Sequence, residues 1–288
     1  DMQSKGLSLS AEDIYNVIKS SLKDAVVALS WGSCTGEIIS KEGLLLTNHH
    51  CADDLIQFHS TTEKDYLKNG FWAMNKSEEL ANENLTASIL VRIENVTERV
   101  FSKINGSATE EDRRKKIRAV ANEISNEISD TSHYTSRLRS FYGGNEFYLF
   151  IYETFLYVRL VGAPPSSIGK FGGDTDNWMW PRHTGDFTLL RIYADTNNKP
   201  AKYSKENVPY RPKYHFKIQL DGVENNDFTM VYGFPGSTDR YLTSFGVNQA
   251  LKLKNKTIID IRSKKLEIMK EGMDKDRETY LKYATKYS

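Results

Sequence analysis

The stretch LLLTNHHC at residues 44–51 places two histidines and a cysteine directly after a short apolar run. A second stretch, TGDFTLLRIY at residues 184–193, places Asp186 at the head of a segment in which apolar and polar residues alternate. Short apolar runs and two-residue alternation are typical of β-strands. These two segments therefore predict that the chain is built around strands, with histidine and aspartate side chains close to strand ends.

Further strands are predicted on both sides of these segments. The runs are short, rich in β-branched or aromatic residues, and separated by Gly, Pro or charged residues. They comprise residues 25–29, 36–39, 88–93, 145–152, 157–161 and, before a Gly/Pro turn, 228–236. We therefore expect a mostly β fold.

Helical periodicity interrupts the strands in three places. Residues 10–22 begin with a capping signal and continue with apolar residues at helical spacing. Thr109 can cap a second helix, whose apolar stripe comprises Ile117, Val120, Ala121, Ile124 and Ile128. From about residue 248 the pattern predicts a long amphipathic helix without a Gly or Pro stop signal. We expect a mostly β domain over residues 1–246 and the beginning of a helical domain over residues 247–288, as part of a longer protein.

The bulk composition excludes several classes of function. The chain has 288 residues and a formal net charge of +1, with acidic and basic residues interspersed. Nothing in this balance points to nucleic acid or to an anionic membrane as a partner. No apolar run approaches the roughly 20 residues that a membrane-spanning helix needs.

The only two cysteines, Cys34 and Cys51, flank a predicted hairpin that would bring them side by side. A disulfide there would close a short loop, worth about 3 kcal/mol in the chain-entropy estimate, and would anchor the neighbouring His50. We expect this disulfide and therefore an oxidising compartment. The alternative is a pair of buried thiols in a cytosolic protein.

A histidine and an aspartate in this order match the base and the orienting carboxylate of the serine-protease triad. Because neighbouring side chains of an extended strand point to opposite faces, only one of His49 and His50 can face a cleft. We expect His50, which adjoins the cysteine, to be the base and Asp186 to orient it. For the same reason, consecutive strand residues cannot converge on one metal ion. The sequence implies no metal and no cofactor.

Two longer motifs resemble one peptidase family. The run FGGDTDNWMWPRHTGDF at residues 171–187 and the run YGFPGSTDRY at residues 232–241 are similar to the bacterial family that includes dipeptidyl peptidases 7 and 11. Those proteins are chymotrypsin-clan serine exopeptidases with an inserted helical domain. The resemblance extends from about residue 25 to residue 288.

The resemblance implies a double β-barrel, represented here by the first barrel with its helical insertion, the opening strands of the second barrel and the start of an inserted all-α domain. It implies His50 and Asp186 as catalytic residues, and Asn177 and Trp178 as part of the clamp on the free N-terminus of a peptide substrate. An amide oxygen and an indole ring suit an ammonium group. The family's nucleophilic serine sits in a glycine-flanked turn, and no serine of this chain has that context.

The expected function is therefore that of a periplasmic or secreted dipeptidyl aminopeptidase, homodimeric as a whole protein and inactive as this fragment. One alternative is a trypsin-like endopeptidase, in which Asn177 and Trp178 have no role at the substrate's N-terminus. The other is a non-catalytic peptide-binding protein on a degenerate protease fold. The missing serine favours the second alternative, whereas the retained His50 and Asp186 disfavour it.

Overall fold

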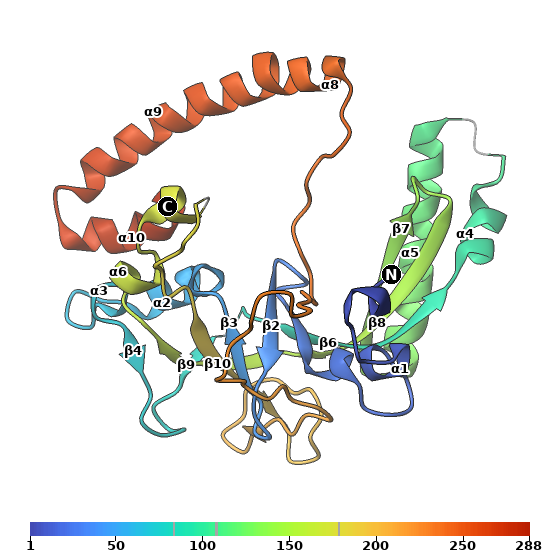
Figure 1. The fold of residues 1–288 in the computed structure, drawn as a ribbon, viewed down its shortest axis with the longest axis horizontal. Coiled ribbons are helices and arrows are strands. Elements are labelled where there is room, and N and C mark those ends of the chain that lie inside the picture. The colour runs from blue at the N-terminus through green and yellow to red at the C-terminus, as the bar shows by residue number, and fades with distance from the viewer. Residues whose placement is uncertain (83, 107–108, 178) are drawn as a thin grey trace. The chain divides into compact units, whose positions relative to one another are not determined.

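The computed structural model describes residues 1–82, 84–106, 109–177 and 179–288 (Figure 1). The chain forms two compact units. The first contains residues 1–46, 81–159 and 190–234, and the second contains residues 47–80, 160–189 and 235–288. Strands β9 (Tyr157–Ala163) and β10 (Thr188–Ala194) run from one unit into the other.

The first unit is dominated by antiparallel strands. Its strands pair in the order β3-β2-β1-β6-β8-β7, which makes most neighbours in the sheet also neighbours along the chain. The paired strands are β1 (Val26–Leu29), β2 (Cys34–Ile38), β3 (Leu44–Thr47), β6 (Ala87–Asn95), β7 (Tyr134–Phe141) and β8 (Glu146–Phe155). Two short strands lie off this path: β5 (Leu80–Asn82) pairs with β9, and β11 (Val208–Pro209) pairs with β10. The predicted mostly β fold with helical insertions is confirmed, and the pairing is antiparallel.

A helical insertion covers one end of this sheet. Helices α4 (Thr97–Ile104) and α5 (Glu110–Thr131) pack on β8, where alternate residues are buried. Thr109 caps α5 by accepting a hydrogen bond from the Asp112 N–H, as the sequence predicts. The core of this part comprises Val100, Ile104, Val120, Ile124, Phe147, Leu149 and Ile151. The predicted apolar stripe of α5 thus finds its partner on the sheet.

The second unit is mostly helical and carries a short antiparallel pair. In that pair, β4 (Phe71–Trp72) meets the end of β9, with Phe71 opposite Ala163. The helical segments are η3 (His49–Cys51), α2 (Asp53–His59), α3 (Tyr66–Asn69), α6 (Ser166–Gly169), α7 (Gly173–Asn177), α8 (Ser244–Gln249), the π-helical η4 (Ala250–Asn255), α9 (Lys256–Met273) and α10 (Arg277–Tyr287). Within the described part of the chain, no helix has the length and apolarity required to cross a bilayer.

The N-terminal helix is shorter than the sequence predicts. The first unit begins with η1 (Gln3–Lys5), α1 (Ala11–Ile14) and η2 (Leu22–Ala25), and α1 ends before Tyr15. Two interactions stop it: the Asn16 side chain accepts hydrogen bonds from the Ile18 and Lys19 N–H groups, and the Tyr15 hydroxyl accepts one from Ile93 N–H in β6. Side-chain bonds of this kind compete with the helical ladder.

The strand predicted over residues 228–236 does not form, and this segment is irregular. Its contact with β2 is made by a side chain, because the Phe234 N–H donates to the Thr35 hydroxyl at 2.7 Å. Val231 is 97% exposed, so the alternating pattern has no second layer to pack against. Alternation alone does not produce a strand without a neighbour that supplies the backbone hydrogen bonds.

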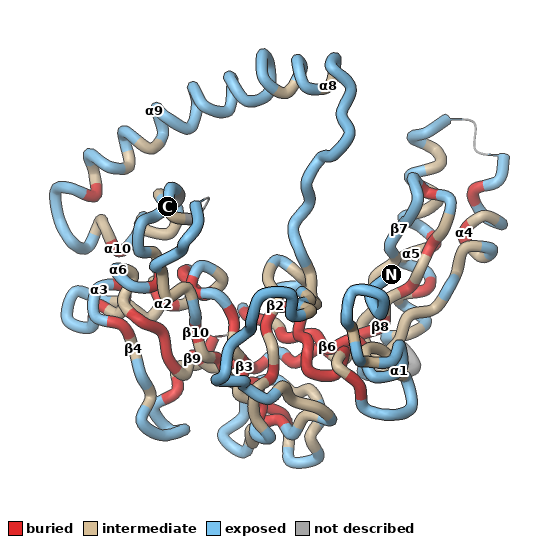
Figure 2. Tube along the Cα trace, viewed as in Figure 1, coloured by how far each residue is buried: buried red, intermediate tan, exposed pale blue. Residues whose placement is uncertain are grey.

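The helix predicted after residue 248 is broken once. Helix α9 ends at Met273, and α10 starts after Asp276, whose carboxylate accepts from the Thr279 N–H at 2.7 Å. This capping interaction replaces the backbone bond that a continuous helix would make. Figure 2 shows that α9 is exposed along most of its length, whereas buried residues follow β6 and β8.

The expected disulfide is present. Cys34 begins β2 and Cys51 ends η3, and both of the chain's cysteines are disulfide-bonded. The antiparallel pairing of β2 with β3, in which Ile38 lies opposite Leu45, brings the two ends of this hairpin together.

Truncation of the buried core should cost more than truncation of the exposed α9 surface. Ile151 is fully buried in the α4–α5–β8 core, so Ile151→Ala is expected to lower the free energy of unfolding by about 2–5 kcal/mol. The matched change Ile259→Ala, at a residue that is 61% exposed, should shift it by no more than about 0.5 kcal/mol. Urea unfolding followed by circular dichroism measures both, and equal effects would contradict this packing.

Candidate active site

The two adjacent histidines occupy very different environments. Strand β3 ends at Thr47, and the chain then turns through the 3-10 segment η3 into α2. His49 is fully buried, whereas 61% of the His50 side chain is exposed. Alternation along an extended strand, the sequence-based reason for expecting only one of the two histidines to face a cleft, was wrong because neither histidine is in a strand. The tight turn nevertheless separates the two rings.

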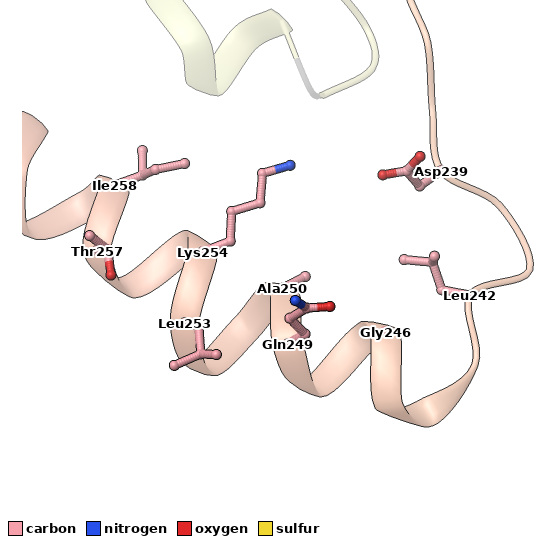
Figure 3. A pocket seen from close by; sticks show the side chains of 9 residues that line it. All are labelled: Asp239, Leu242, Gly246, Gln249, Ala250, Leu253, Lys254, Thr257 and Ile258. Atoms are coloured by element: carbon pink, nitrogen blue, oxygen red, sulfur yellow. The ribbon is translucent and has the colours of Figure 1, made fainter. Parts of the chain in front are cut away.

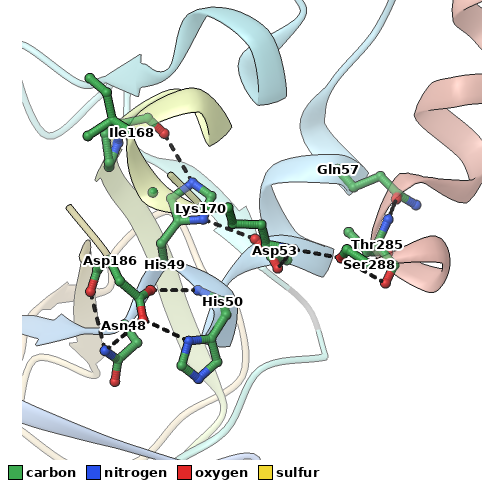
Figure 4. A network of polar contacts seen from close by, with 12 residues as sticks. Asn48, His49, His50, Asp53, Gln57, Ile168, Lys170, Asp186, Thr285 and Ser288 are labelled. Carbon is green, nitrogen blue, oxygen red and sulfur yellow. Dashed lines mark hydrogen bonds and ion pairs between the residues drawn. The ribbon is translucent and has the colours of Figure 1, made fainter. Parts of the chain in front are cut away.

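His50 and Asp186 are in direct contact (Figure 4). The His50 Nδ1 atom lies 2.9 Å from Asp186 Oδ2, and the His50 backbone N–H donates to Asp186 Oδ1 at 3.1 Å. The Asn48 amide donates to Asp186 Oδ2 at 3.1 Å and to the Asp186 carbonyl oxygen at 3.2 Å. The carboxylate, with 24% of its side chain exposed, therefore accepts three hydrogen bonds from the single turn that follows β3.

The loop that carries Asp186 is tied to α6. The Thr184 hydroxyl lies 3.0 Å from the Ile168 carbonyl oxygen and 3.1 Å from that of Gly169, and it can donate to either. The Gly185 N–H donates to the Ile168 carbonyl oxygen at 2.9 Å. A Cβ atom at Gly185 would lie 2.8 Å from the Ile168 side chain, so only glycine allows this close approach. These hydrogen bonds to α6 fix the loop directly before Asp186, which lies two residues before the start of β10.

The electrostatics of the pair favour a charged carboxylate. Burial alone would raise the pKa of Asp186, but the hydrogen bonds from the His50 ring and backbone outweigh it and hold this pKa below its usual value. The hydrogen bond to Asp186 raises the pKa of His50, and partial burial offsets part of that rise. Because the carboxylate is ionised, Nδ1 of His50 must be the donor. In the neutral ring, Nε2 is then the acceptor.

A buried polar chain lies behind His50. His49 Nε2 lies 3.1 Å from the Pro164 carbonyl oxygen, and His49 Nδ1 faces Asp53 Oδ1 at 3.0 Å, outside the angular range of an ordinary hydrogen bond. The other carboxylate oxygen of Asp53 forms an ion pair with Lys170 Nζ. Burial would raise the pKa of Asp53, but His49 and Lys170 together keep it below its usual value.

Both His50 and Asp186 line a hollow of about 610 Å³. Its other lining residues include Asp53, Lys170, Phe171, Thr184 and Tyr287. A second hollow, of about 630 Å³, lies between residues 239–242 and the helices α8, η4 and α9 (Figure 3). Its lining holds Asp239 and Lys254 but no histidine, so it lacks a base of the required kind. The first hollow is the candidate active site.

The two expected clamp residues follow Asp176 in the segment between α6 and Asp186. Asn177 is the last residue of α7, and its side chain lies outside the described part of the structure, as does all of Trp178. The following segment is anchored nearby, because the His183 N–H donates to the Asp176 carboxylate at 3.2 Å.

Sequence reasoning missed three polar residues of the site: Asn48, Asp53 and Lys170. Asp53 follows His49 by four residues, a spacing that could have indicated a contact across one helical turn. Asn48 stands inside the stretch that was singled out, but its bond to Asp186 requires the tertiary fold. Lys170 is separated by 117 positions from its partner Asp53, and no local pattern identifies it.

Comparison with known proteins decides the family. The profile of the Peptidase S46 family matches residues 1–288. The chain belongs to the peptidase S46 family. Among its S46 relatives, an Asp/Glu-specific dipeptidyl-peptidase of Flavobacterium psychrophilum is 48% identical over 288 residues, and a dipeptidyl-peptidase 7 of Capnocytophaga gingivalis is 44% identical over 288 residues. Both alignments cover all of this chain and 40% of the relative.

A solved S46 structure has the same fold. The crystal structure of Porphyromonas endodontalis DPP11 in complex with the dipeptide Arg-Asp superposes with a TM-score of 0.92 at 44% identity, covering 99% of this chain and 42% of that one. The chain therefore spans about two fifths of the length of the curated relatives and of this structure.

The His50–Asp186 contact predicts a defined pH dependence. Because the carboxylate favours the charged imidazole, the pKa of His50 should lie above its ordinary value of 6.5, and Asp186→Asn should lower it. The contact between protonated His50 and Asp186 stabilises the folded state fully at pH values below the pKa of His50 in the unfolded chain. This stabilisation is lost as the pH rises through the higher pKa of His50 in the folded state. Titration of ¹³C-labelled histidine by NMR, with His50→Ala to assign the signal, measures both values. A variant titrating at the same pH as the parent would contradict the contact.

Proposed function

We propose that this chain is the N-terminal part of a serine-type dipeptidyl peptidase in which His50 is the general base and Asp186 orients it. The observation that carries the proposal is the 2.9 Å contact between His50 Nδ1 and Asp186 Oδ2. It sets the tautomer in which Nε2 can accept a proton, and the carboxylate then stabilises the imidazolium that forms. The names of the relatives support the reaction class.

The nucleophile in this proposal is a serine outside these 288 residues. Among the described residues, no serine hydroxyl is hydrogen-bonded to His50, and the relatives are about two and a half times as long as the matched region. The serine oxygen would bond to the scissile carbonyl carbon while His50 takes its proton. His50 would then give that proton to the departing amine as the C–N bond breaks, and water would hydrolyse the acyl-enzyme.

Release of dipeptides requires recognition of the substrate's free N-terminus. Asn177 and Trp178 are the proposed contacts, since an amide oxygen can accept from the α-ammonium group and an indole can pack beside it. The proposed substrates are therefore peptides with a free N-terminus. The relatives include both Asp/Glu-specific dipeptidyl-peptidases and dipeptidyl-peptidases 7 at 44–49% identity, so the proposal names the class of substrate and no preferred side chain.

The proposed location of the whole protein is the periplasm or the cell exterior. The disulfide between Cys34 and Cys51 supports an oxidising compartment, because such bonds are rare in reducing cytosol. We also propose that the whole protein is a homodimer, on the resemblance of residues 171–187 to the dipeptidyl-peptidase family.

Removal of the base should abolish turnover while sparing the fold. In the full-length protein, His50→Ala is expected to lower kcat by about 10⁴-fold or more, because the nucleophile then has no proton acceptor. The exposed His50 ring contributes little packing, so the thermal midpoint should stay close to that of the parent. His215→Ala, outside the hollow, is the matched control and should keep full activity. Retention of activity in His50→Ala would refute the assignment.

The exopeptidase part of the proposal is tested by blocking the substrate's N-terminus. Hydrolysis of a dipeptidyl fluorogenic amide by the full-length protein should be lost when the α-amine is acetylated, because the ammonium contact disappears. Asn177→Ala should raise KM for the free peptide by about 10-fold, as expected for loss of a hydrogen bond to a charged group. Cleavage that continues on the acetylated substrate would favour an endopeptidase.

A further inference from the structure

We propose that Asp53 and Lys170 are positioning residues of this site. Their ion pair, extended by His49, holds the turn that carries His50 and balances the charge around its ring. The consequence for catalysis rests on the proposed function, whereas the effect on His50 itself does not.

The geometry ties together the two segments that supply the His50–Asp186 pair. Asp53 begins α2, directly after the turn that carries His49 and His50. Lys170 directly follows α6, the helix whose carbonyl groups hold the loop that leads to Asp186. An ion pair between Asp53 and Lys170 therefore connects the support of the base with the support of its carboxylate partner.

His49 links Asp53 to the backbone next to His50, because its ring faces Asp53 and it directly precedes His50 in the chain. Its ring is fully buried, and its two nitrogen atoms face the Pro164 carbonyl oxygen at 3.1 Å and Asp53 Oδ1 at 3.0 Å. Gly169 closes the other side, since a Cβ there would lie 2.2 Å from His49 Cδ2. A ring enclosed in this way is held in one orientation by close packing, and it fixes the position of residue 49 next to His50.

The charges of Asp53 and Lys170 have opposite effects on the protonation of His50. Both Asp53 and Lys170 line the same hollow as His50. The Asp53 carboxylate favours the protonated ring and the Lys170 ammonium disfavours it, so their effects on the pKa of His50 have opposite signs. Only 8% of Asp53 is exposed, and a carboxylate this deeply buried is costly unless it is paired.

The other groups that face His50 are its direct partner Asp186 and residues without a charged side chain of the Asp53 or Lys170 kind. Asp186 faces the ring from the loop before β10 and makes the direct hydrogen bond. His49 adjoins it in η3, and Tyr287 of α10 lines the same hollow together with Thr184, Thr285 and Ser288, whose hydroxyl accepts a hydrogen bond from Lys170 Nζ at 2.6 Å. Among the described lining residues, Asp53 and Lys170 therefore carry the charged side chains besides His50 and its direct partner.

The test measures the ionisation of His50 without using catalysis. Diethyl pyrocarbonate modifies neutral imidazole, so the pH dependence of its reaction at His50, read by peptide mass spectrometry, reports the pKa of this ring. Asp53→Asn should move the midpoint to lower pH, and Lys170→Met should move it to higher pH. The double variant should lie between the two single variants. An intermediate midpoint is expected because the two charges act on His50 with opposite signs, and any departure from the sum of the two single shifts measures the coupling between Asp53 and Lys170.

A matched pair at the C-terminal end of α9 serves as the control. Lys270 and Asp274 form an exposed ion pair with a 2.9 Å contact, outside the hollow, so Asp274→Asn and Lys270→Met remove the same charges without touching the site. Neither should move the His50 midpoint. Asp53→Asn is isosteric, and Lys170→Met keeps the aliphatic stem, so thermal midpoints can verify that each variant folds. An unmoved midpoint in both folded site variants, or shifts in the same direction, would overturn the inference.

Kinetics of the full-length protein separate this inference from the proposed function. If Asp53 positions the base, Asp53→Asn should lower kcat by about tenfold or more and leave KM nearly unchanged, with the acidic limb of the pH profile displaced to lower pH. A full-length protein without dipeptidyl-peptidase activity would refute the proposed function, while the chemical modification still decides the role of the pair. An active protein whose variants keep the parental kcat and pH profile would refute only the positioning role.

Discussion

The site depends on the need to satisfy one half-buried carboxylate. Asp186 accepts from the His50 ring, the His50 backbone and the Asn48 amide, and these three donors come from a single turn after β3. A carboxylate removed from water is stable as an anion only with such partners. This requirement brings two segments that are 136 residues apart into contact, and the same bonds determine the tautomer of His50.

The neighbouring histidines show how environment assigns different roles to one residue type. His49 is enclosed by Pro164, Gly169 and Asp53, whereas His50 projects into a hollow with its ring largely exposed. A buried imidazole with fixed partners gives rigidity to the turn. An exposed imidazole with one carboxylate partner keeps a nitrogen atom available for proton transfer.

Local patterns predicted most of the regular structure because strands and helices with a buried face carry strong periodicity. The stripe on α5 and the alternation in β8 both succeeded, since each packs against the other. The strand expected over residues 228–236 failed, because its formation depends on a pairing partner that local alternation does not report. The helix expected to continue beyond Ile14 failed because Asn16 and Tyr15 make competing hydrogen bonds.

The amino-acid sequence by itself determined the β-rich architecture, the disulfide, and His50 and Asp186 as the candidate pair, because apolar periodicity and distinctive motifs are local properties. The tertiary structure decided which atoms meet: Nδ1 of His50 faces Asp186, and His49 turns inward toward Asp53 and Lys170. Contacts between residues more than a hundred positions apart depend on how loops converge. The loops meet where buried polar groups can form hydrogen bonds and side chains can pack. Neither requirement produces a periodic pattern in the amino-acid sequence.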